Sequence, residues 1–267
     1  KGFTVIGYGK LGGRELAYSS DLDLVFLHDR PVDDVTNGER SIPVTQFYVK
    51  LAQRILHFFN TRMTSGLLYE LDMRLRPSGN SGVLVVHVDS YQAYQKEEAW
   101  TWEHQALVRA RAVYGHQEIV SQFNRVRMNI LTRDREPENL LKEVLEMRQK
   151  MRTHLNKSSD SMTDVKHGKG GLIDIEFLVQ FLVLNYANQH PKIAQFSDNL
   201  RFLEALATYK IITKNEQETL SHWYCHLRDY GHRSALQNAE NLMLNDEFSE
   251  IEQQVFPIIR RYCATSD

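Results

Sequence analysis

Two aspartates stand on a segment whose alternation is typical of a β-strand. Asp21 and Asp23 occur in the run 20–26, where apolar residues take the alternate positions. Because side chains along a strand point to alternate faces, the two carboxylates should share one face and the leucines the other. Two carboxylates held this close repel each other unless a cation lies between them. Hard oxygen ligands on a rigid strand suit Mg²⁺, so this segment predicts a metal site.

A second alternating segment, residues 67–75, adds another carboxylate. Asp72 should share one strand face with Glu70, Arg74 and Arg76, while apolar side chains occupy the other. If this strand lies beside the first, Asp72 joins Asp21 and Asp23. Three carboxylates can hold two Mg²⁺ ions about 4 Å apart, the arrangement used for phosphoryl and nucleotidyl displacement. Arg74 and Arg76 could then contact a triphosphate.

Each of these features also has a purely structural explanation. An Asp-x-Asp pair at the start of a strand is often only a solvated turn. The charged face of residues 68–76 could be an exposed sheet face with cross-strand ion pairs. The combination, in this order and with a helix expected between the two strands at 46–59, favours the metal-site interpretation.

Glycines follow the first expected strand, residues 3–7. Gly9, Gly12 and Gly13 allow a close approach of the backbone and could aim N–H groups at anionic oxygens. A short helix expected from Arg14 would add its dipole. Gly7, Gly9 and Gly12 also match the G-x-G-x-x-G pattern of dinucleotide-binding proteins. However, the few residues that follow before the next strand are too short for a parallel crossover, so we expect no nicotinamide site.

The elements around these residues indicate an α+β protein. Short strands are expected at 3–7, 22–27, 67–75 and 83–88, with helical spacing at 46–59 and 100–113. From about residue 137 onward almost every apolar pattern is helical. We therefore expect a small mixed-sheet domain over residues 1–115, followed by an all-α helical bundle over residues 116–267.

The composition excludes several classes of protein. The chain has 267 residues and a formal charge of −2, which argues against a broad basic surface for nucleic acid. Its two cysteines exclude a disulfide-built secreted scaffold, and a cytoplasmic setting is the default expectation. No apolar run is long enough to predict a membrane span. The chain starts at Lys1 and runs almost at once into a strand, so we expect it to be part of a longer protein.

The order of these motifs resembles the nucleotidyltransferase superfamily related to DNA polymerase β. A glycine-rich loop, the run Ser19-Ser20-Asp21-Leu22-Asp23-Leu24 and a later strand carboxylate carry this resemblance. Many members have Gly-Ser in the loop, whereas this chain has Gly12-Gly13, so phosphate contacts would come from backbone N–H groups, Ser19 or Ser20. More narrowly, four segments resemble glutamine synthetase adenylyltransferase: 8–16, 72–79, 102–111 and 170–177.

The resemblance implies transfer of AMP from ATP to a tyrosine hydroxyl of glutamine synthetase, which releases pyrophosphate and down-regulates nitrogen assimilation. It implies two Mg²⁺ ions held by Asp21, Asp23 and Asp72, with Asp72 on the nucleophile side. The nucleotide contacts that it implies are Gly9, Gly12, Gly13, Ser19, Ser20, Arg74, Arg76 and Arg109. For Arg109 a surface or ion-paired role is equally consistent. Glu70, Asp174 and Glu176 are candidates to support the site, although an acidic first turn usually only complements a helix dipole.

Alternatives remain within the same resemblance. The family carries two similar catalytic domains, and this chain resembles the adenylylating one more closely than the one that removes AMP by phosphorolysis. A uridylyltransferase acting on a small signalling protein would keep the fold and change the acceptor. A non-catalytic module that binds a PII-type protein or glutamine is a third reading. The expected partners are glutamine synthetase as substrate, with PII-type protein and glutamine as regulators, and neither membrane nor nucleic acid.

Overall fold

The computed structural model describes residues 2–18, 20–62, 64, 66 and 69–263. It divides into two compact units, Lys1–Ile130 and Leu131–Asp267. The division lies later than the expected 115/116 boundary, because helix α5 (Gln117–Leu131) packs on the first unit. Its Phe123 ring lies 6.1 Å from the ring of Tyr91, and its Arg127 donates to the carbonyl of Leu107. Each unit is described by itself.

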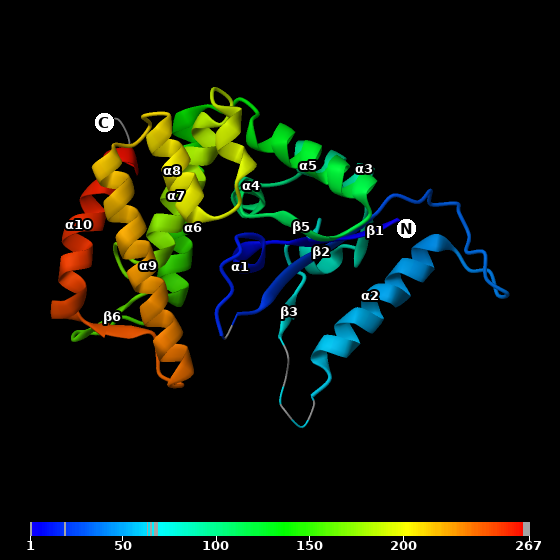
Figure 1. Cartoon of the computed structure of the whole chain (residues 1–267), viewed down its shortest axis with the longest axis horizontal. Helices are drawn as coiled ribbons and strands as arrows, with labels where there is room; N and C mark the ends of the chain where they lie inside the picture. The colour runs from blue at the N-terminus through cyan, green and yellow to red at the C-terminus, as the bar shows by residue number, and fades with distance from the viewer. Residues whose placement is uncertain (1, 19, 63, 65, 67–68, 264–267) are drawn as a thin grey trace. The chain divides into compact units, whose positions relative to one another are not determined.

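The first unit combines a mixed sheet with helices, as the α+β prediction requires (Figure 1). Its elements in chain order are β1 (Phe3–Gly7), α1 (Gly9–Gly12), β2 (Leu22–His28), α2 (Val44–Asn60), β3 (Leu71–Asp72), the 3₁₀ turn η1 (Gly79–Ser81), β4 (Val85–His87), α3 (Val88–Glu97), α4 (Thr101–Val108), β5 (Arg111–Gly115) and α5.

The sheet has the order β3-β2-β1-β5. Strand β4 also pairs with β2, but further along that strand than β3 does. Strand β1 is antiparallel to both β2 and β5, whereas β3 and β4 run parallel to β2. Because β1 and β2 are antiparallel, the glycine pattern between them does not open a parallel crossover, and the dinucleotide-binding unit is excluded as expected.

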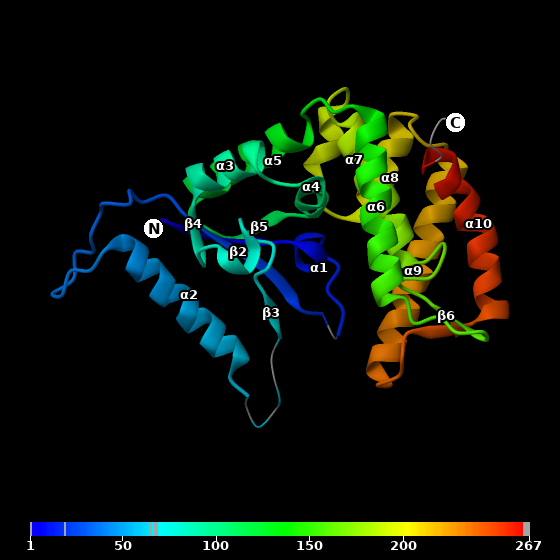
Figure 2. The same ribbon diagram turned by 180° about the vertical axis from the view of Figure 1, so that it is seen from behind.

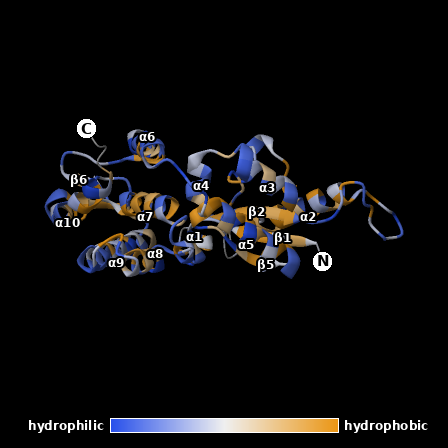
Figure 3. Ribbon diagram, turned by 90° about the horizontal axis from the view of Figure 1, so that it is seen from above, coloured by the Kyte–Doolittle hydropathy of each residue, from blue (hydrophilic) through white to orange (hydrophobic). Residues whose placement is uncertain are grey.

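Strand β2 is the centre of the hydrophobic core. Leu22, Leu24 and Phe26 alternate along one face and pack with Tyr48 and Ala52 of α2. Further along β2, residues of the other face are fully buried as well, which explains the continuous apolar run that ends the strand. Figure 3 shows β1 and β2 as strongly hydrophobic ribbons. The one acidic residue of β2, Asp23, takes its second position, and the other polar residue, His28, ends the strand.

Three local expectations were wrong. Of the alternating segment 67–75, the described residues 69–75 form a strand only over Leu71–Asp72, since the chain turns away at Arg74; residues 67 and 68 lie outside the described part. The helical spacing of 100–113 ends at Val108, and the strand β5 follows. No helix starts at Arg14. Instead Arg14 adopts a left-handed conformation (φ 57°) that ends α1, with Glu15 N–H donating to the Lys10 carbonyl at 2.8 Å, a Schellman-type stop.

The second unit is helical with one short ribbon (Figure 2). Helix α7 contacts α6, α8, α9 and α10, and its residues are largely buried. The strands β6 and β7 pair antiparallel, so the bundle is not purely α-helical. Its elements are α6 (Pro137–Leu155), β6 (Met162–Asp164), α7 (Leu172–Tyr186), the 3₁₀ turn η2 (Pro191–Gln195), α8 (Asn199–Thr208), α9 (Lys214–Leu236), β7 (Leu242–Leu244) and α10 (Asn245–Cys263).

Two capping features of this unit follow the sequence. Pro137 is the first residue of α6, and Thr213 with Glu216 forms a capping box at the start of α9. Among the residues that the structure describes, none of the helices is both long and apolar enough to span a membrane.

Gly12 tests how α1 is held in the first unit. A Cβ atom at this position would stand 1.9 Å from the carbonyl oxygen of Arg109 and 2.5 Å from that of Gly7. We expect Gly12→Ala to destabilise the fold by about 1–3 kcal/mol, because backbone atoms must move to admit the methyl group. Chemical denaturation measures the effect. The matched control is Gly38→Ala, where a Cβ would meet nothing within 4 Å; equal stability of the two variants would contradict the packing described for α1.

Candidate active site

The pairing of β2 with β3 brings the predicted carboxylates together. The two strands run parallel with Asp23 opposite Asp72, and Asp21 lies just before the first residue of β2. One carboxylate oxygen from each of the three residues lies within 4.8 Å of the other two. Asp21 is exposed, whereas Asp23 and Asp72 are half-buried. The three groups thus form an accessible acidic cluster at the N-terminal end of β2.

The carboxylates of this cluster differ in their electrostatic environment. Burial, together with the charges of Asp21 and Asp72, raises the pKa of Asp23 to about 6. In contrast, hydrogen bonds from Arg74 lower the pKa of Asp72. Ionisation of Asp23 is therefore less favourable in the protein than in water. A bound cation would relieve the repulsion between the carboxylates.

Gly9 allows α1 to approach the cluster. Its backbone has a positive φ of 50°, and a Cβ atom there would lie 2.3 Å from Oδ2 of Asp23. The N–H of Tyr8 donates to the carbonyl of Asp23 at 2.9 Å. The start of α1 is therefore seated directly against the Asp23 carboxylate, in a place that only glycine fits without strain.

The other residues of the predicted phosphate loop have local partners. The N–H of Gly12 donates to Tyr8 and that of Gly13 to Gly9, so these two groups close α1 and do not face an anion. The Ser20 hydroxyl accepts from the N–H of Ala17 at 2.8 Å and closes the turn before β2. Ser19 lies outside the described residues.

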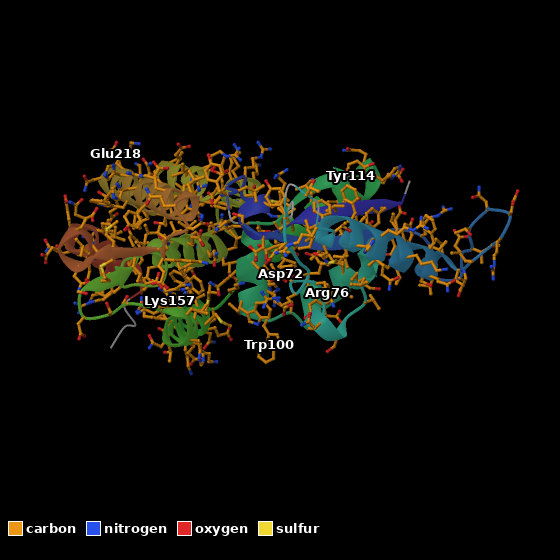
Figure 4. All side chains as sticks on the ribbon, turned by 90° about the horizontal axis from the view of Figure 1, so that it is seen from below. Asp72, Arg76, Trp100, Tyr114, Lys157 and Glu218 are labelled. Atoms are coloured by element: carbon orange, nitrogen blue, oxygen red, sulfur yellow. The ribbon has the colours of Figure 1, made fainter. Side chains whose placement is uncertain are left out.

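The charged residues after Asp72 separate, because the strand ends there. Arg74 is exposed, and its Nε donates to both oxygens of Asp72, at 3.0 and 2.8 Å. Arg76 is buried and donates to the carbonyls of Met73, Asn80 and Gly82. Arg76 therefore fixes the turn rather than facing the cluster; Figure 4 labels it together with Asp72. Glu70 is exposed, and its carbonyl accepts from the N–H of Leu22 at 2.8 Å.

Arg109 is also committed within the fold. Its guanidinium forms a buried ion pair with Glu15, and both side chains are 5% exposed. Arg111 donates to the carbonyls of Leu11 and Gly12 at 3.1 Å, which holds the end of α1 on β5. Glu15 and Arg109 are 94 positions apart in the chain, so no local sequence pattern could have identified Glu15 as the partner of Arg109.

Asp174 and Glu176 lie in the second unit and have partners there. Asp174 is buried at the start of α7, where it accepts from Arg148, from Arg152 and from the N–H of Gly170. Glu176 accepts from the hydroxyl of Tyr224 at 3.2 Å. These contacts give Asp174 a structural role in the helical unit.

A second group of potential ligands follows the other end of β2. Asp29, His116 and Glu118 each offer one atom, and these atoms lie within 4.8 Å of one another. The sequence analysis missed this group because His116 and Glu118 follow β5, far from Asp29 in the chain. Exposed acidic groups are common without an ion.

Comparison with known families agrees with this geometry. Residues 1–126 match the family model described as glutamate-ammonia ligase adenylyltransferase. This part of the chain is therefore similar to that family. Residues 138–253 match the model of the PII-uridylyltransferase family. Both are nucleotidyltransferase families, so the chain is related to enzymes that transfer nucleotidyl groups, and the family predicted from the sequence is confirmed.

The acidic cluster makes a prediction about stability. Replacing Asp23 by Asn removes a half-buried charge that two neighbouring carboxylates oppose. Because folding raises the pKa of Asp23 from 3.8 to about 6, ionisation of this carboxyl lowers the stability of the fold. The loss develops as the pH rises between these two values and stays constant at higher pH. We therefore expect Asp23→Asn to raise Tm by a few degrees at pH 7.5 in EDTA. The exposed residue Asp33 provides the control Asp33→Asn, which should leave Tm unchanged. A lower Tm for Asp23→Asn would contradict the electrostatic argument.

The Glu15–Arg109 pair makes a second prediction. Arg109→Met leaves a buried carboxylate without its partner, which costs about 3 kcal/mol or more in such sites. Glu15→Gln in the same chain should recover much of this loss. Urea denaturation of the single and double variants measures the coupling, with exposed Arg54→Met as the control. If Arg109 served only a phosphate, Arg109→Met would leave the denaturation midpoint unchanged and raise only the KM for ATP.

Proposed function

We propose that this protein transfers AMP from ATP to a tyrosine hydroxyl of glutamate-ammonia ligase (glutamine synthetase). The observation that carries the proposal is the cluster of Asp21, Asp23 and Asp72, brought together by the pairing of β2 with β3 in a unit that matches the adenylyltransferase family model. Three carboxylates beside an accessible strand end suit a reaction in which a triphosphate must be held and its charge neutralised.

The cluster fits Mg²⁺ by its chemistry. All three residues supply carboxylate oxygens, the ligands that Mg²⁺ prefers, and these oxygens lie within 4.8 Å of one another. The negative charges of Asp21 and Asp72, which together with burial raise the pKa of Asp23, support a cation at this position. Two Mg²⁺ ions at these residues would activate the attacking hydroxyl and neutralise the leaving pyrophosphate.

Arg74 provides a way to keep the cluster stable when no nucleotide is bound. Its guanidinium pairs with Asp72, yet its side chain is 73% exposed and can move into solvent. An arginine so placed can release Asp72 for a cation and turn to the triphosphate, where a bidentate contact suits phosphate oxygens. Gly9 keeps the backbone of α1 next to the same carboxylates.

The match of the helical unit to the PII-uridylyltransferase family supports a second candidate. In this alternative, the protein uses the same carboxylates to transfer UMP from UTP to a PII-type protein. The carboxylate chemistry is identical, and the nucleotide base and the acceptor protein differ. Phosphorolytic removal of AMP from glutamine synthetase is the third reaction consistent with this family, and it requires phosphate instead of ATP. PII-type protein and glutamine are the regulators we propose.

The decisive assay measures label transfer. The chain is incubated with Mg²⁺ and either α-labelled ATP or α-labelled UTP, together with purified glutamine synthetase or a PII-type protein. We expect label from ATP on glutamine synthetase, at a tyrosine identified by mass spectrometry. Label from UTP on the PII-type protein, or release of ADP from adenylylated glutamine synthetase in the presence of phosphate, would replace the first proposal by one of the alternatives.

The carboxylates are tested by the same assay. Asp21→Asn, Asp23→Asn and Asp72→Asn should each lower transfer by at least about 100-fold, because each removes charge that holds the reacting phosphate and its cation. Asp33→Asn is the matched control and should keep full activity. Full activity in any of the three variants, with the fold intact by circular dichroism, would overturn the assignment. Absence of both transfer and ATP binding in the unaltered chain would favour a non-catalytic regulatory module.

A further inference from the structure

The second unit contains a cavity that the proposed reaction does not use. It has a volume of about 320 Å³ and is lined by residues of α6, α7 and α10. Figure 2 shows these three helices in the same unit. The described residues that line the cavity all belong to the range 131–267. The volume is at the lower end of the range for small-molecule sites.

Most of the cavity wall is apolar. Val144 and Leu178 are almost completely buried, and Leu145, Phe177, Phe256 and Ile259 add aliphatic and aromatic surface. Such a wall favours a ligand with an apolar body. The Cys263 thiol is also part of the lining, and burial raises its pKa to about 12, so it contributes no charge.

The polar part of the wall carries an excess of positive charge. Arg148, Arg152 and Arg260 line the cavity together with one carboxylate, Asp174. Both oxygens of that carboxylate already accept hydrogen bonds: Arg152 donates to each of them, at 2.9 and 2.7 Å, and Gly170 N–H donates to Oδ2 at 2.8 Å. Within the lining, three arginines therefore accompany a single carboxylate.

Arg148 gives a specific indication of a ligand. Its side chain is 7% exposed; Nε pairs with Asp174 and Nη2 donates to the carbonyl of His167 at 3.0 Å. Among the described residues, Nη1 has no hydrogen-bond partner although it is buried, and the same is true of Nε of Arg152. A buried donor without a partner costs about 1–3 kcal/mol, more when it is charged. An acceptor within hydrogen-bond distance of either nitrogen would remove this cost.

We infer that the cavity binds a small carboxylate with an apolar body. The buried guanidinium nitrogens would hold the carboxylate, and Arg260, which is exposed at the surface, would add a third positive charge. A carboxylate suits this mostly apolar wall better than a phosphate dianion, because transferring one charge out of water costs less than transferring two. The binding chemistry does not depend on the proposed AMP transfer.

The probe for this site is 4-phenylbutyrate, added to the full chain and followed by isothermal titration calorimetry. Its neutral amide and 2-phenylethyl phosphate are titrated in the same way as comparison ligands of similar shape. We expect the carboxylate to bind and the amide to bind at least about tenfold more weakly, since it lacks the charge-assisted hydrogen bonds. Phosphate binding tighter than carboxylate binding, equal binding of the amide, or no binding of the carboxylate would each overturn the inference.

Variants locate the binding. Arg260→Gln changes an exposed lining residue and should weaken 4-phenylbutyrate by about tenfold, whereas Arg233→Gln, an exposed arginine of α9 outside the lining, should not. Leu145→Trp fills the cavity without changing its charge and should abolish binding. Circular dichroism confirms that each variant is folded. Unchanged affinity in both Arg260→Gln and Leu145→Trp would place the ligand elsewhere and contradict the inference.

Discussion

The candidate active site depends on repulsion between carboxylates that the sheet holds together. Strand β3 pairs with β2 over only two residues, yet this pairing puts Asp72 opposite Asp23. The cost is visible in the raised pKa of Asp23, whose causes are burial and then the charges of Asp21 and Asp72. Hydrophobic packing of Leu22, Leu24 and Phe26 against α2 stabilises β2 and offsets this repulsion. A cation or an arginine must balance the charge, and the ion pair of Arg74 with Asp72 does so in part.

The surroundings of the cluster are organised to hold α1 in place. Gly9 admits the Asp23 carboxylate, Gly12 admits the carbonyl of Arg109, and Arg111 binds the last carbonyls of α1. The buried Glu15–Arg109 ion pair ties the loop after α1 to the end of α4. Residues that resemble phosphate ligands by their type are thus used mainly to position the backbone beside the carboxylates.

The sequence predicted the part of this arrangement that depends on local alternation. Strand β1 and the start of β2 follow from short buried apolar runs, and the shared face of Asp21 and Asp23 follows from the two-residue period. The period could not show where β3 stops, because Arg74 and Arg76 continue the alternation while Arg76 binds three backbone carbonyls in a turn. Nor could it show that Arg109 pairs with Glu15, or that Gly12 and Gly13 use their N–H groups within α1, since both depend on tertiary contacts.

We propose that Asp21, Asp23 and Asp72 together hold divalent cations for a nucleoside triphosphate. Electron paramagnetic resonance of Mn²⁺, titrated into the chain with a non-hydrolysable ATP analogue, measures this most directly. We expect about two bound ions per chain with magnetic coupling between them, the pattern of a two-metal site, and loss of that coupling in Asp23→Asn. Uncoupled Mn²⁺, or the same stoichiometry and coupling in the variant, would contradict it.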